Sequence, residues 1–454
     1  MREAFGKYVP ERALVLAGGD AFLALGLMGL GVLLFQGDPS QTLAGAAAAP
    51  LLTVALLYIL FLLGRYNPGE PARARGLAAA ACVLGALVAA CGLTLPHLIP
   101  SEGLFLAIAV LPLFLWAWGR FMGLGRPRGF FAETAIMVGA GQLAEEVKAA
   151  AKQFPDIRLV ARNGTFEEPL SIIHEHARSQ DRWKRLRQLP VVGRLFPRVV
   201  LVAAAEPGST GGRRQALILS ANGIPVLSGE SFYEKITGSV LLEYLDRDQA
   251  WKTGGCVPGR TSRLHDLTER AGALLLLALL FPLLAAVAIA IKLSSPGPVF
   301  FSQERVGKDG HPFPMIKFRS MQDKAEVGTG PVWAQKNDPR VTPVGRLIRK
   351  THIDELPQLI NVVLGHMSLV GPRPERPFFV EKLSQTIPGY HLRHTVRPGI
   401  TGWAQINYSY GASANDAREK LKYELFYIKH RSPALDLYIL FATARTLFAT
   451  SGAR

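Results

Sequence analysis

LHDLTERAGALLLLALLFPLLAAVAIAIKLSSPGPV, residues 264–299, contains an apolar run from Ala271 to Ile291. At a rise of ~1.5 Å per residue, this run is long enough to cross the ~30 Å hydrocarbon core of a bilayer. Basic residues flank it on both sides: Arg260, Arg263 and Arg270 before it, and Lys292, Arg305 and Lys308 after it. Because such residues favour the cytoplasmic side, both flanks are predicted to lie in the cytoplasm. Pro282, near the middle, bends or breaks a helix. A re-entrant hairpin that enters and leaves on one face satisfies both observations, and a kinked span is the alternative.

Upstream of this run, four further apolar segments lie at about 13–35, 49–64, 76–95 and 103–119. Each is close to the ~20 residues of a transmembrane helix, so residues 1–130 are predicted to form a four-helix transmembrane anchor. The distribution of arginine and lysine in its connections places both ends of the anchor in the cytoplasm. Asp20, the only charged residue within these segments, lies near one end, which argues against a transport pathway.

The composition agrees with a membrane protein. The chain is 49% hydrophobic, with a mean hydropathy of +0.20, which is too apolar for a wholly soluble protein. Three cysteines, Cys82, Cys91 and Cys256, provide no disulfide framework, so the soluble parts are expected in the cytoplasm. On composition alone, the net charge of +16 fits a nucleic acid, an anionic membrane surface or a phosphorylated substrate equally well.

Residues 131–260 are predicted to form a small Rossmann-like α/β domain. TAIMVGAGQLAEEVKAAAKQF (134–154) has the pattern of a strand, a glycine turn and an amphipathic helix, and RVVLVAAAE, QALILSANGIPVL and SVLLEYL continue the alternation. Gly139–Ala144 matches G-x-G-x-x-A, but no carboxylate ends the strand near residue 160, where a ribose ligand is expected. A non-catalytic domain without a bound cofactor is therefore favoured. The basic stretch 178–198 is interpreted as a solvated or lipid-facing surface, so no nucleic-acid partner is expected.

Residues 261–454 contain the charged motifs that carry chemistry. They are FFSQERVG (300–307), KFRSM (317–321), NDPRVTPVGRLIRKTHIDELPQLINV (337–362), GHMSLVGPRPE (365–375) and VRPGITGWAQINYSYGAS (396–413). Arginines clustered in short loops suit the oxygens of a phosphate or diphosphate, because guanidinium groups present forked donors. Attraction to anionic headgroups is the alternative.

Asp354 and Glu355 stand together before the apolar run LPQLINVVL. With Thr351, they give T-x-x-D, so capping of the following helix is one interpretation. The other is catalytic. Adjacent helical residues point about 100° apart, so one carboxylate can face a phosphorus atom while the other faces a metal ion.

In this order, the five motifs resemble those of the bacterial sugar transferases, also called polyprenyl-phosphate glycosyl-1-phosphate transferases, over residues 262–454. The anchor and the α/β domain make the chain similar to the long-form monotopic phosphoglycosyl transferases of exopolysaccharide or O-antigen assembly. The resemblance implies a mixed α/β, mainly helical catalytic domain at 261–454, with a re-entrant helix at 268–292 that breaks at Pro282. It implies a hexose-1-phosphate transferase that takes a UDP-sugar, forms a phosphosugar–aspartate intermediate with release of UMP, and passes the sugar phosphate to polyprenyl (undecaprenyl) phosphate.

The resemblance also implies roles for individual residues. Asp354 would be the nucleophile, Glu355 would help to hold Mg²⁺, and Lys317 would lie near the phosphates or the active-site carboxylates. The implied substrate and phosphate ligands are Arg319, Arg349, Arg373 and Arg397, each with a surface, headgroup or packing role as its alternative. Some relatives continue W-A-Q-x-N with G-R-N, whereas this chain has Asn407-Tyr408-Ser409-Tyr410-Gly411, so the donor sugar stays open.

The implied setting is the cytoplasmic face of a bacterial inner membrane, and the subgroup is compatible with a homodimer. The tail, 417–448, is expected to pack on the lipid surface or on another subunit. Two other functions are carried as alternatives: a membrane-tethered dinucleotide-binding regulator or oxidoreductase built on Gly139–Ala144, and a non-catalytic scaffold of a polysaccharide assembly system.

Overall fold

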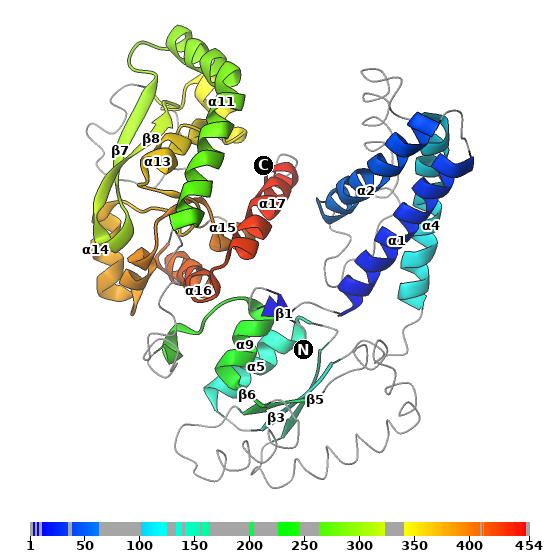
Figure 1. Ribbon diagram of the computed structural model, residues 1–454. Helices are drawn as coiled ribbons and strands as arrows, with labels where there is room; N and C mark the ends of the chain where they lie inside the picture. The colour runs from blue at the N-terminus through cyan, green and yellow to red at the C-terminus, as the bar shows by residue number, and fades with distance from the viewer. Residues whose placement is uncertain are drawn as a thin grey trace. The chain divides into compact units, whose positions relative to one another are not determined.

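The computed structural model describes residues 3–4, 7–8, 11–34, 39–62, 101–124, 133–138, 141–154, 157–162, 199–203, 226–245, 263–322, 340–408, 411 and 413–450. The chain divides into two compact units, Met1–Thr237 and Gly238–Arg454 (Figure 1). The second unit begins before residue 261, the boundary expected from the sequence. Several predicted features lie outside the described residues: the segment 76–95, the three cysteines, Gly139 and Ala140, and the basic stretch 178–198.

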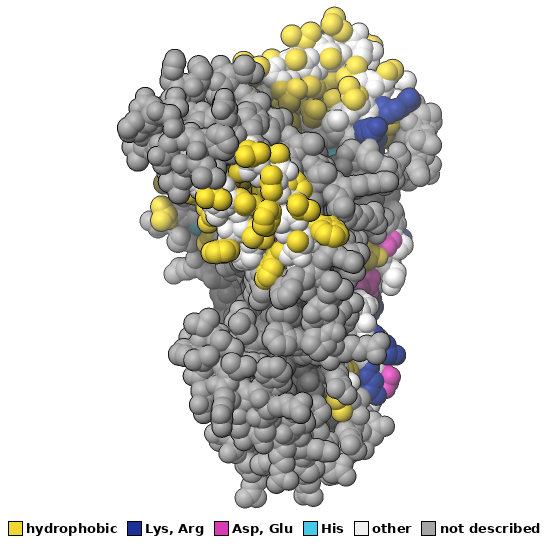
Figure 2. Space-filling view, turned by 90° about the vertical axis from the view of Figure 1, so that its right-hand side faces the viewer, with side chains coloured by type: hydrophobic (Ala, Val, Ile, Leu, Met, Phe, Trp, Pro, Cys, Tyr) yellow, Lys and Arg dark blue, Asp and Glu magenta, His cyan; other side chains and the backbone are white. Residues whose placement is uncertain are grey.

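Three of the predicted N-terminal segments form helices of 24 residues each: α1 (Glu11–Leu34), α2 (Pro39–Leu62) and α4 (Ser101–Leu124). α1 packs against both of the others through buried apolar side chains that include Met28 and Leu56. Side chains such as Phe22 face outward, and Figure 2 shows hydrophobic groups gathered on this outer face. An apolar exterior is compatible with an anchor in lipid. The apolar stretches described within these helices are 10–17 residues long, so four complete spans stay a prediction.

The first unit also contains a four-stranded parallel sheet in the order β4-β3-β5-β6. Its strands are β3 (Glu133–Val138), β4 (Ile157–Arg162), β5 (Val199–Ala203) and β6 (Val226–Ser228). Helices α5 (Gln142–Lys152) and α9 (Gly229–Thr237) pack together and against its strands. A short pair, β1 (Glu3–Ala4) and β2 (Lys7–Tyr8), completes this unit's described elements. The alternating pattern thus gives a parallel sheet.

The predicted α/β pattern is wrong for one segment. SVLLEYL does not continue the α/β alternation. Its residues Leu242–Tyr244 form a 3-10 turn, η2, in the second unit. The N–H of Val240 donates to the carbonyl oxygen of Lys422, 3.0 Å away, so this apolar segment is bound to a helix of the second unit. Its hydrophobicity serves that contact rather than the sheet.

The second unit is mainly helical. After α11 (Arg263–Ser294), the strands β7 (Phe300–Val306) and β8 (Pro312–Phe318) form an antiparallel hairpin around η3 (Lys308–Gly310). The elements that follow are α12 (Pro343–Lys350), η4 (Ile353–Glu355), α13 (Gln358–Leu364), β9 (Ser368–Val370), α14 (Pro377–Thr386), η5 (Tyr390–Thr395), β10 (Gly399–Thr401), α15 (Trp403–Asn407), α16 (Ala414–His430) and α17 (Pro433–Thr450). β9 and β10 pair in parallel.

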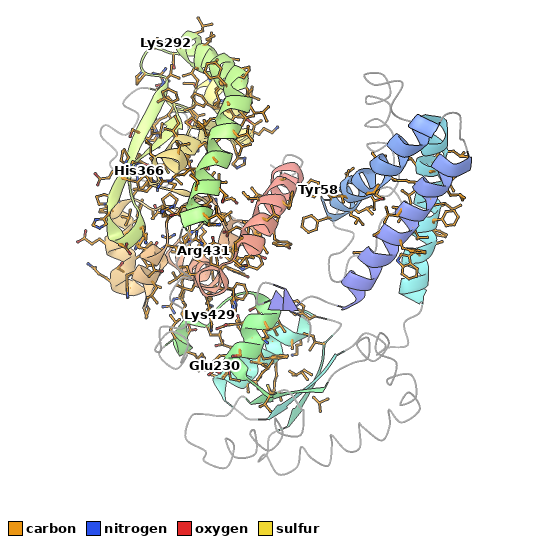
Figure 3. The ribbon with its side chains drawn as sticks, in the orientation of Figure 1. Tyr58, Glu230, Lys292, His366, Lys429 and Arg431 are labelled. Atoms are coloured by element: carbon orange, nitrogen blue, oxygen red, sulfur yellow. The ribbon has the colours of Figure 1, made fainter. Side chains whose placement is uncertain are left out.

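Helix α11 is one 32-residue helix with Pro282 inside it. Its upper part bends over towards Lys292, whose ammonium donates to the carbonyl oxygen of Gly297 (Figures 1 and 3). Pro282 therefore lies in a bent helix rather than between two separate helical arms. Most of the apolar surface of α11 is uncovered by the rest of the unit: Leu275 is 71% exposed and Leu279 73%. Among the described residues, α11 is the one helix long and apolar enough to cross a bilayer, although re-entry itself stays a prediction.

Candidate active site

Asp354 and Glu355 lie in a tight turn between two short helices. α12 begins at Thr342, whose Oγ1 accepts a hydrogen bond from the N–H of Gly345, and ends at Thr351. His352 then adopts the left-handed conformation, with a φ of 57°, which is uncommon for a residue that has a Cβ atom. The single 3-10 turn η4 follows and contains both acidic residues.

The alternative interpretation, in which Thr351 caps the following helix, is wrong. The Thr351 hydroxyl donates back to carbonyl oxygens of the last turn of α12, 2.9 and 3.2 Å away. The residue at the N-cap of α13 is Pro357, which makes no side-chain capping bond. Thr351 thus ends one helix instead of beginning the next.

Glu355 is held by two cations that come from distant parts of the sequence. Lys317 Nζ lies 3.0 Å from Glu355 Oε1. Arg373 donates from Nη1 to Oε2 over 3.1 Å and from Nη2 to Oε1, which makes a forked pair. Only 15% of the Glu355 side chain is exposed. Charge-assisted, bidentate bonds of this kind are among the strongest in proteins, so the orientation of Glu355 is fixed.

The alternation of strand β8 brings Lys317 to this position. Phe313 and Met315 point into the core against Leu359 and Val362 of α13. Because side chains alternate across a strand, Lys317 lies on the same face, at the end nearest η4. An apolar strand face therefore ends in a cation directly beside the acidic turn.

Arg373 comes from the loop after β9, which crosses the segment containing β10 at very close range. A Cβ atom on Gly371 would collide with the carbonyl of Arg397, and one on Gly399 would collide with the main chain of Gly371. Only residues without a side chain allow two backbones to approach so closely. These glycines set the path on which Arg373 reaches Glu355.

Asp354 is the uncompensated member of the pair. Among the residues that the structure describes, none forms a hydrogen bond or an ion pair with its carboxylate. Burial, followed by the negative charge of Glu355, raises the pKa of Asp354 to about 6, while Lys317, Arg349 and Arg373 act in the opposite direction. A partly buried carboxylate with a raised pKa is a common property of catalytic groups.

The charge state of the neighbouring residues is set differently. Burial raises the pKa of Glu355, but Arg373 and Lys317 outweigh this effect and hold that pKa well below its usual range. Burial lowers the pKa of Lys317, and Glu355 opposes that shift. Glu355 is therefore ionised at every physiological pH, whereas Asp354 titrates near neutrality.

The remaining predicted arginines lie at different distances from this pair. Arg349, in the last turn of α12, is close enough to Asp354 to lower its pKa. Arg319 is buried and donates to the carbonyl oxygens of Ser295 and Pro296, both over 2.8 Å, at the end of α11. Arg397 pairs with Asp266 of α11, with a separation of 2.6 Å. Arg349 and Arg373 thus lie at the acidic turn. Arg319 instead binds the turn that follows α11, and Arg397 binds α11 itself.

Two further residues of the charged motifs, Trp403 and Asn361, make packing and main-chain contacts within the second unit. Trp403 is buried, stacks on Phe426 with ring centroids 5.6 Å apart, and donates to the carbonyl oxygen of Gly238. Asn361, which the sequence analysis did not single out, is fully buried on α13. Its amide donates to the carbonyl of Pro314 and accepts from the N–H of Ile316. A polar residue inside the apolar run LPQLINVVL was the available signal.

The acidic turn can be tested as a magnesium site. The described residues contain no cluster of three or more Asp, Glu, His or Cys side chains. Mg²⁺ commonly binds one or two carboxylates and completes its shell with water and substrate phosphates, so Asp354 and Glu355 fit that mode. An ion bound by Glu355 would share its oxygens with Lys317 and Arg373, and the Asp354 carboxylate lies next to it in the turn.

Comparisons with known proteins identify the family of this chain. Residues 260–450 match the sequence profile of the family "Bacterial sugar transferase". The chain is 42% identical over 189 residues to the exopolysaccharide production protein PSS of Rhizobium leguminosarum bv. phaseoli, covering 40% of this chain and 92% of that protein. The chain belongs to the bacterial sugar transferase family.

Other sugar transferases named after different donor sugars are about equally similar. The UDP-N-acetylgalactosamine-undecaprenyl-phosphate N-acetylgalactosaminephosphotransferase of Aeromonas hydrophila is 45% identical over 235 residues, covering 51% of this chain and 54% of that protein. The UDP-glucose:undecaprenyl-phosphate glucose-1-phosphate transferase of Escherichia coli (strain K12) is 48% identical over 187 residues, covering 40% of this chain and 39% of that protein. The chain thus spans about half or less of the length of these two relatives. Overall identity does not select a donor sugar.

Proposed function

We propose that this chain transfers a sugar-1-phosphate from a UDP-sugar to polyprenyl phosphate through a covalent intermediate on Asp354. The observation that carries the proposal is the unequal state of the two adjacent carboxylates. Glu355 is neutralised by Lys317 and Arg373, whereas Asp354 has no ionic partner among the described residues. A free carboxylate beside fixed cations is suited to attack a phosphorus atom, because the cations stabilise the charge on its oxygens.

The first step forms one bond and breaks one. A carboxylate oxygen of Asp354 attacks the phosphorus that carries the sugar, and the bond from that phosphorus to the bridging oxygen breaks. UMP leaves with the bridging oxygen, and the sugar phosphate stays on Asp354 as an acyl phosphate. Arg373, Lys317 and Arg349 supply the positive charge that holds the phosphate oxygens. In the second step, an oxygen of polyprenyl phosphate attacks the same phosphorus and releases Asp354 as a carboxylate.

We assign the divalent ion to the same turn, with Glu355 as a ligand and Asp354 beside it. When bound, Mg²⁺ would spread the negative charge of the diphosphate. The protein's own contribution is to keep Glu355 ionised and oriented, which the Lys317 and Arg373 contacts achieve.

The proposed location is the cytoplasmic face of the bacterial inner membrane. It is supported by the exposed apolar surface of α11 and by the basic residues at both of its ends. In the upper right of Figure 2, hydrophobic side chains gather with Lys and Arg side chains at their edge. A re-entrant α11 would bring a lipid phosphate to the acidic turn. A homodimer and a non-catalytic, Rossmann-like role for the parallel sheet belong to the same proposal.

Release of UMP without the lipid acceptor tests the mechanism directly. The full chain in detergent or nanodiscs is mixed with a panel of UDP-sugars and Mg²⁺, and we expect one UMP per active site with one donor and a sugar phosphate bound to protein. Asp354→Asn should abolish both. Asp309→Asn, an exposed hairpin aspartate, is the matched control and should change neither. Full activity of Asp354→Asn would refute the assignment of the nucleophile, and no UMP release by the wild type with any donor would favour a scaffold.

A further inference from the structure

A buried ion pair contacts the main chain of Arg373, the residue whose side chain holds Glu355. Arg393 of η5 donates from Nε to Glu424 Oε2 over 2.9 Å and from Nη2 to Glu424 Oε1 over 2.7 Å. The two side chains are only 7% and 5% exposed. Removing two charges from water costs several kcal/mol per ion, and this cost is often not recovered as stability. The position of the pair therefore calls for another explanation.

The other donors of Arg393 indicate what the pair does. Nη2 also donates to the main-chain carbonyl oxygen of Arg373, 2.8 Å away, and Nη1 donates to the hydroxyl of Tyr390, 2.7 Å away. Glu424 thus orients the guanidinium group of Arg393, which bonds the main chain of Arg373. The side chain of Arg373 in turn bonds Glu355.

The carbonyl group of the next residue is held by a second arginine. Arg305 of β7 donates to the carbonyl oxygen of Pro374 over 3.2 Å and to the side chain of Glu375 over 3.1 Å. Two consecutive carbonyl groups are therefore fixed by two different arginines, and the loop cannot rotate without breaking both sets of bonds. Of these two arginines, Arg393 is the one that bonds the carbonyl of Arg373 itself.

The charge balance explains why Glu424 has to accompany Arg393. Arg373 and Arg393 are both cationic, and the second contacts the backbone of the first. Without a carboxylate, a buried Arg393 would be uncompensated and would repel the cationic side chain that must reach Glu355. Glu424 removes that repulsion while it fixes the plane of the guanidinium group.

We propose that Arg393 and Glu424 are positioning residues for sugar-phosphate transfer: they hold the main chain of Arg373 so that its guanidinium stays on Glu355 beside Asp354. This inference rests on the proposed function. Neither residue touches the reacting groups. Of the groups that Arg393 contacts, Arg373 is the one that bonds Glu355, so an effect on the rate constant that depends on Arg373 is separable from a general contribution to folding.

The test is single-turnover UMP release by the full chain, reconstituted without polyprenyl phosphate. The amplitude counts competent sites and the rate constant reports their geometry. Arg393→Lys keeps the charge but loses the planar fork. We expect its rate constant to fall by about tenfold or more, with the amplitude per folded protein unchanged, because small displacements of catalytic groups are costly. Arg418→Lys is the control, since Arg418 of α16, the helix that contains Glu424, pairs with Glu243 of η2 at the surface.

The decisive measurement is a double-mutant cycle. In an Arg373→Gln background, Arg393→Lys should change the rate constant by less than about twofold, because the group through which it acts is gone. If Arg393→Lys does not fold, Glu424→Gln, which keeps the side-chain shape, should show the same loss and the same dependence on Arg373. An unchanged rate constant, an additive loss in the double variant, or a loss confined to the amplitude would overturn the positioning role. A wild type that releases no UMP would instead refute the proposed function.

Discussion

Replacement of Asn361 by leucine should damage both the stability and the chemistry of this protein. β8 pairs with β7 on one edge only, and the amide of Asn361 bonds its other edge at the carbonyl of Pro314 (2.8 Å) and the N–H of Ile316 (3.0 Å). Leucine has a similar volume but no polar atoms. Both main-chain groups would then be left without a partner next to a fully buried position.

The size of the effect follows from those two bonds. Each of these partly buried bonds contributes about 0.5–1.5 kcal/mol net, so the free energy of unfolding should fall by about 1–3 kcal/mol. Ile316 directly precedes Lys317, so relaxation of this strand edge would also move the ammonium group that holds Glu355. A displacement of about 1 Å in an active site can lower a rate by about a hundredfold.

Denaturant unfolding of the detergent-solubilised chain and single-turnover UMP release measure the two effects. Asn407→Leu is the matched control, because Asn407 makes one local bond to the carbonyl of Trp403 in a partly exposed helix. Its cost should stay near or below about 1 kcal/mol, with an unchanged rate constant. If Asn361→Leu lost no more stability than Asn407→Leu, or kept the full rate constant, the argument that Asn361 fixes the strand edge would be refuted.

Four further predictions concern the acidic turn and the membrane helix. The rate of UMP release should fall about tenfold per pH unit below about pH 6, because Asp354 must lose its proton and its pKa is about 6. A rate that stays constant down to about pH 4 before it falls would contradict this. Because burial penalises the charged form, Asp354→Asn should raise the melting temperature at pH 8 and leave it little changed at pH 3. His352→Gly, which accepts the left-handed φ, should keep UMP release, whereas the β-branched His352→Val should lose most of it; equal activity of the two variants would show that this conformation is dispensable. Cysteines placed at Arg263 and Lys308 should react from the same side of the membrane, and labelling from opposite sides would rule out re-entry of α11.

The sequence was informative where a single local pattern determines the structure. Apolar runs of about 20 residues predicted the N-terminal helices, and α1, α2 and α4 form at three of the four positions. The alternation after residue 134 predicted a parallel sheet. It failed for SVLLEYL, because an apolar segment of that length fits a strand and a packed turn equally well. The contacts with α16, such as that between Val240 and Lys422, distinguish the two structures.

Long-range partners could not be inferred in the same way. The fork of Arg393 on Glu424 and the bonds of Asn361 to β8 join residues that are 31, 47 and 45 positions apart. The presence of an arginine does not by itself reveal whether its guanidinium group binds a phosphate, a carboxylate or a carbonyl, since the forked donors suit all three. Arg319 and Arg373 illustrate the point. Both stand in short charged motifs, yet one holds the turn after α11 and the other holds Glu355.

The same reasoning explains how two adjacent carboxylates acquire different roles. In a 3-10 turn, successive side chains point about 120° apart, so η4 can direct Glu355 at Lys317 and Arg373 while Asp354 stays off both. A shift of one residue in this turn would place Asp354 between the cations and lower its pKa. His352, in the left-handed conformation, precedes the turn. The pair Arg393–Glu424 bonds the main chain of Arg373, one of the two cations on Glu355. Asp354, the proposed nucleophile, is thus kept without an ionic partner by contacts that its neighbours make.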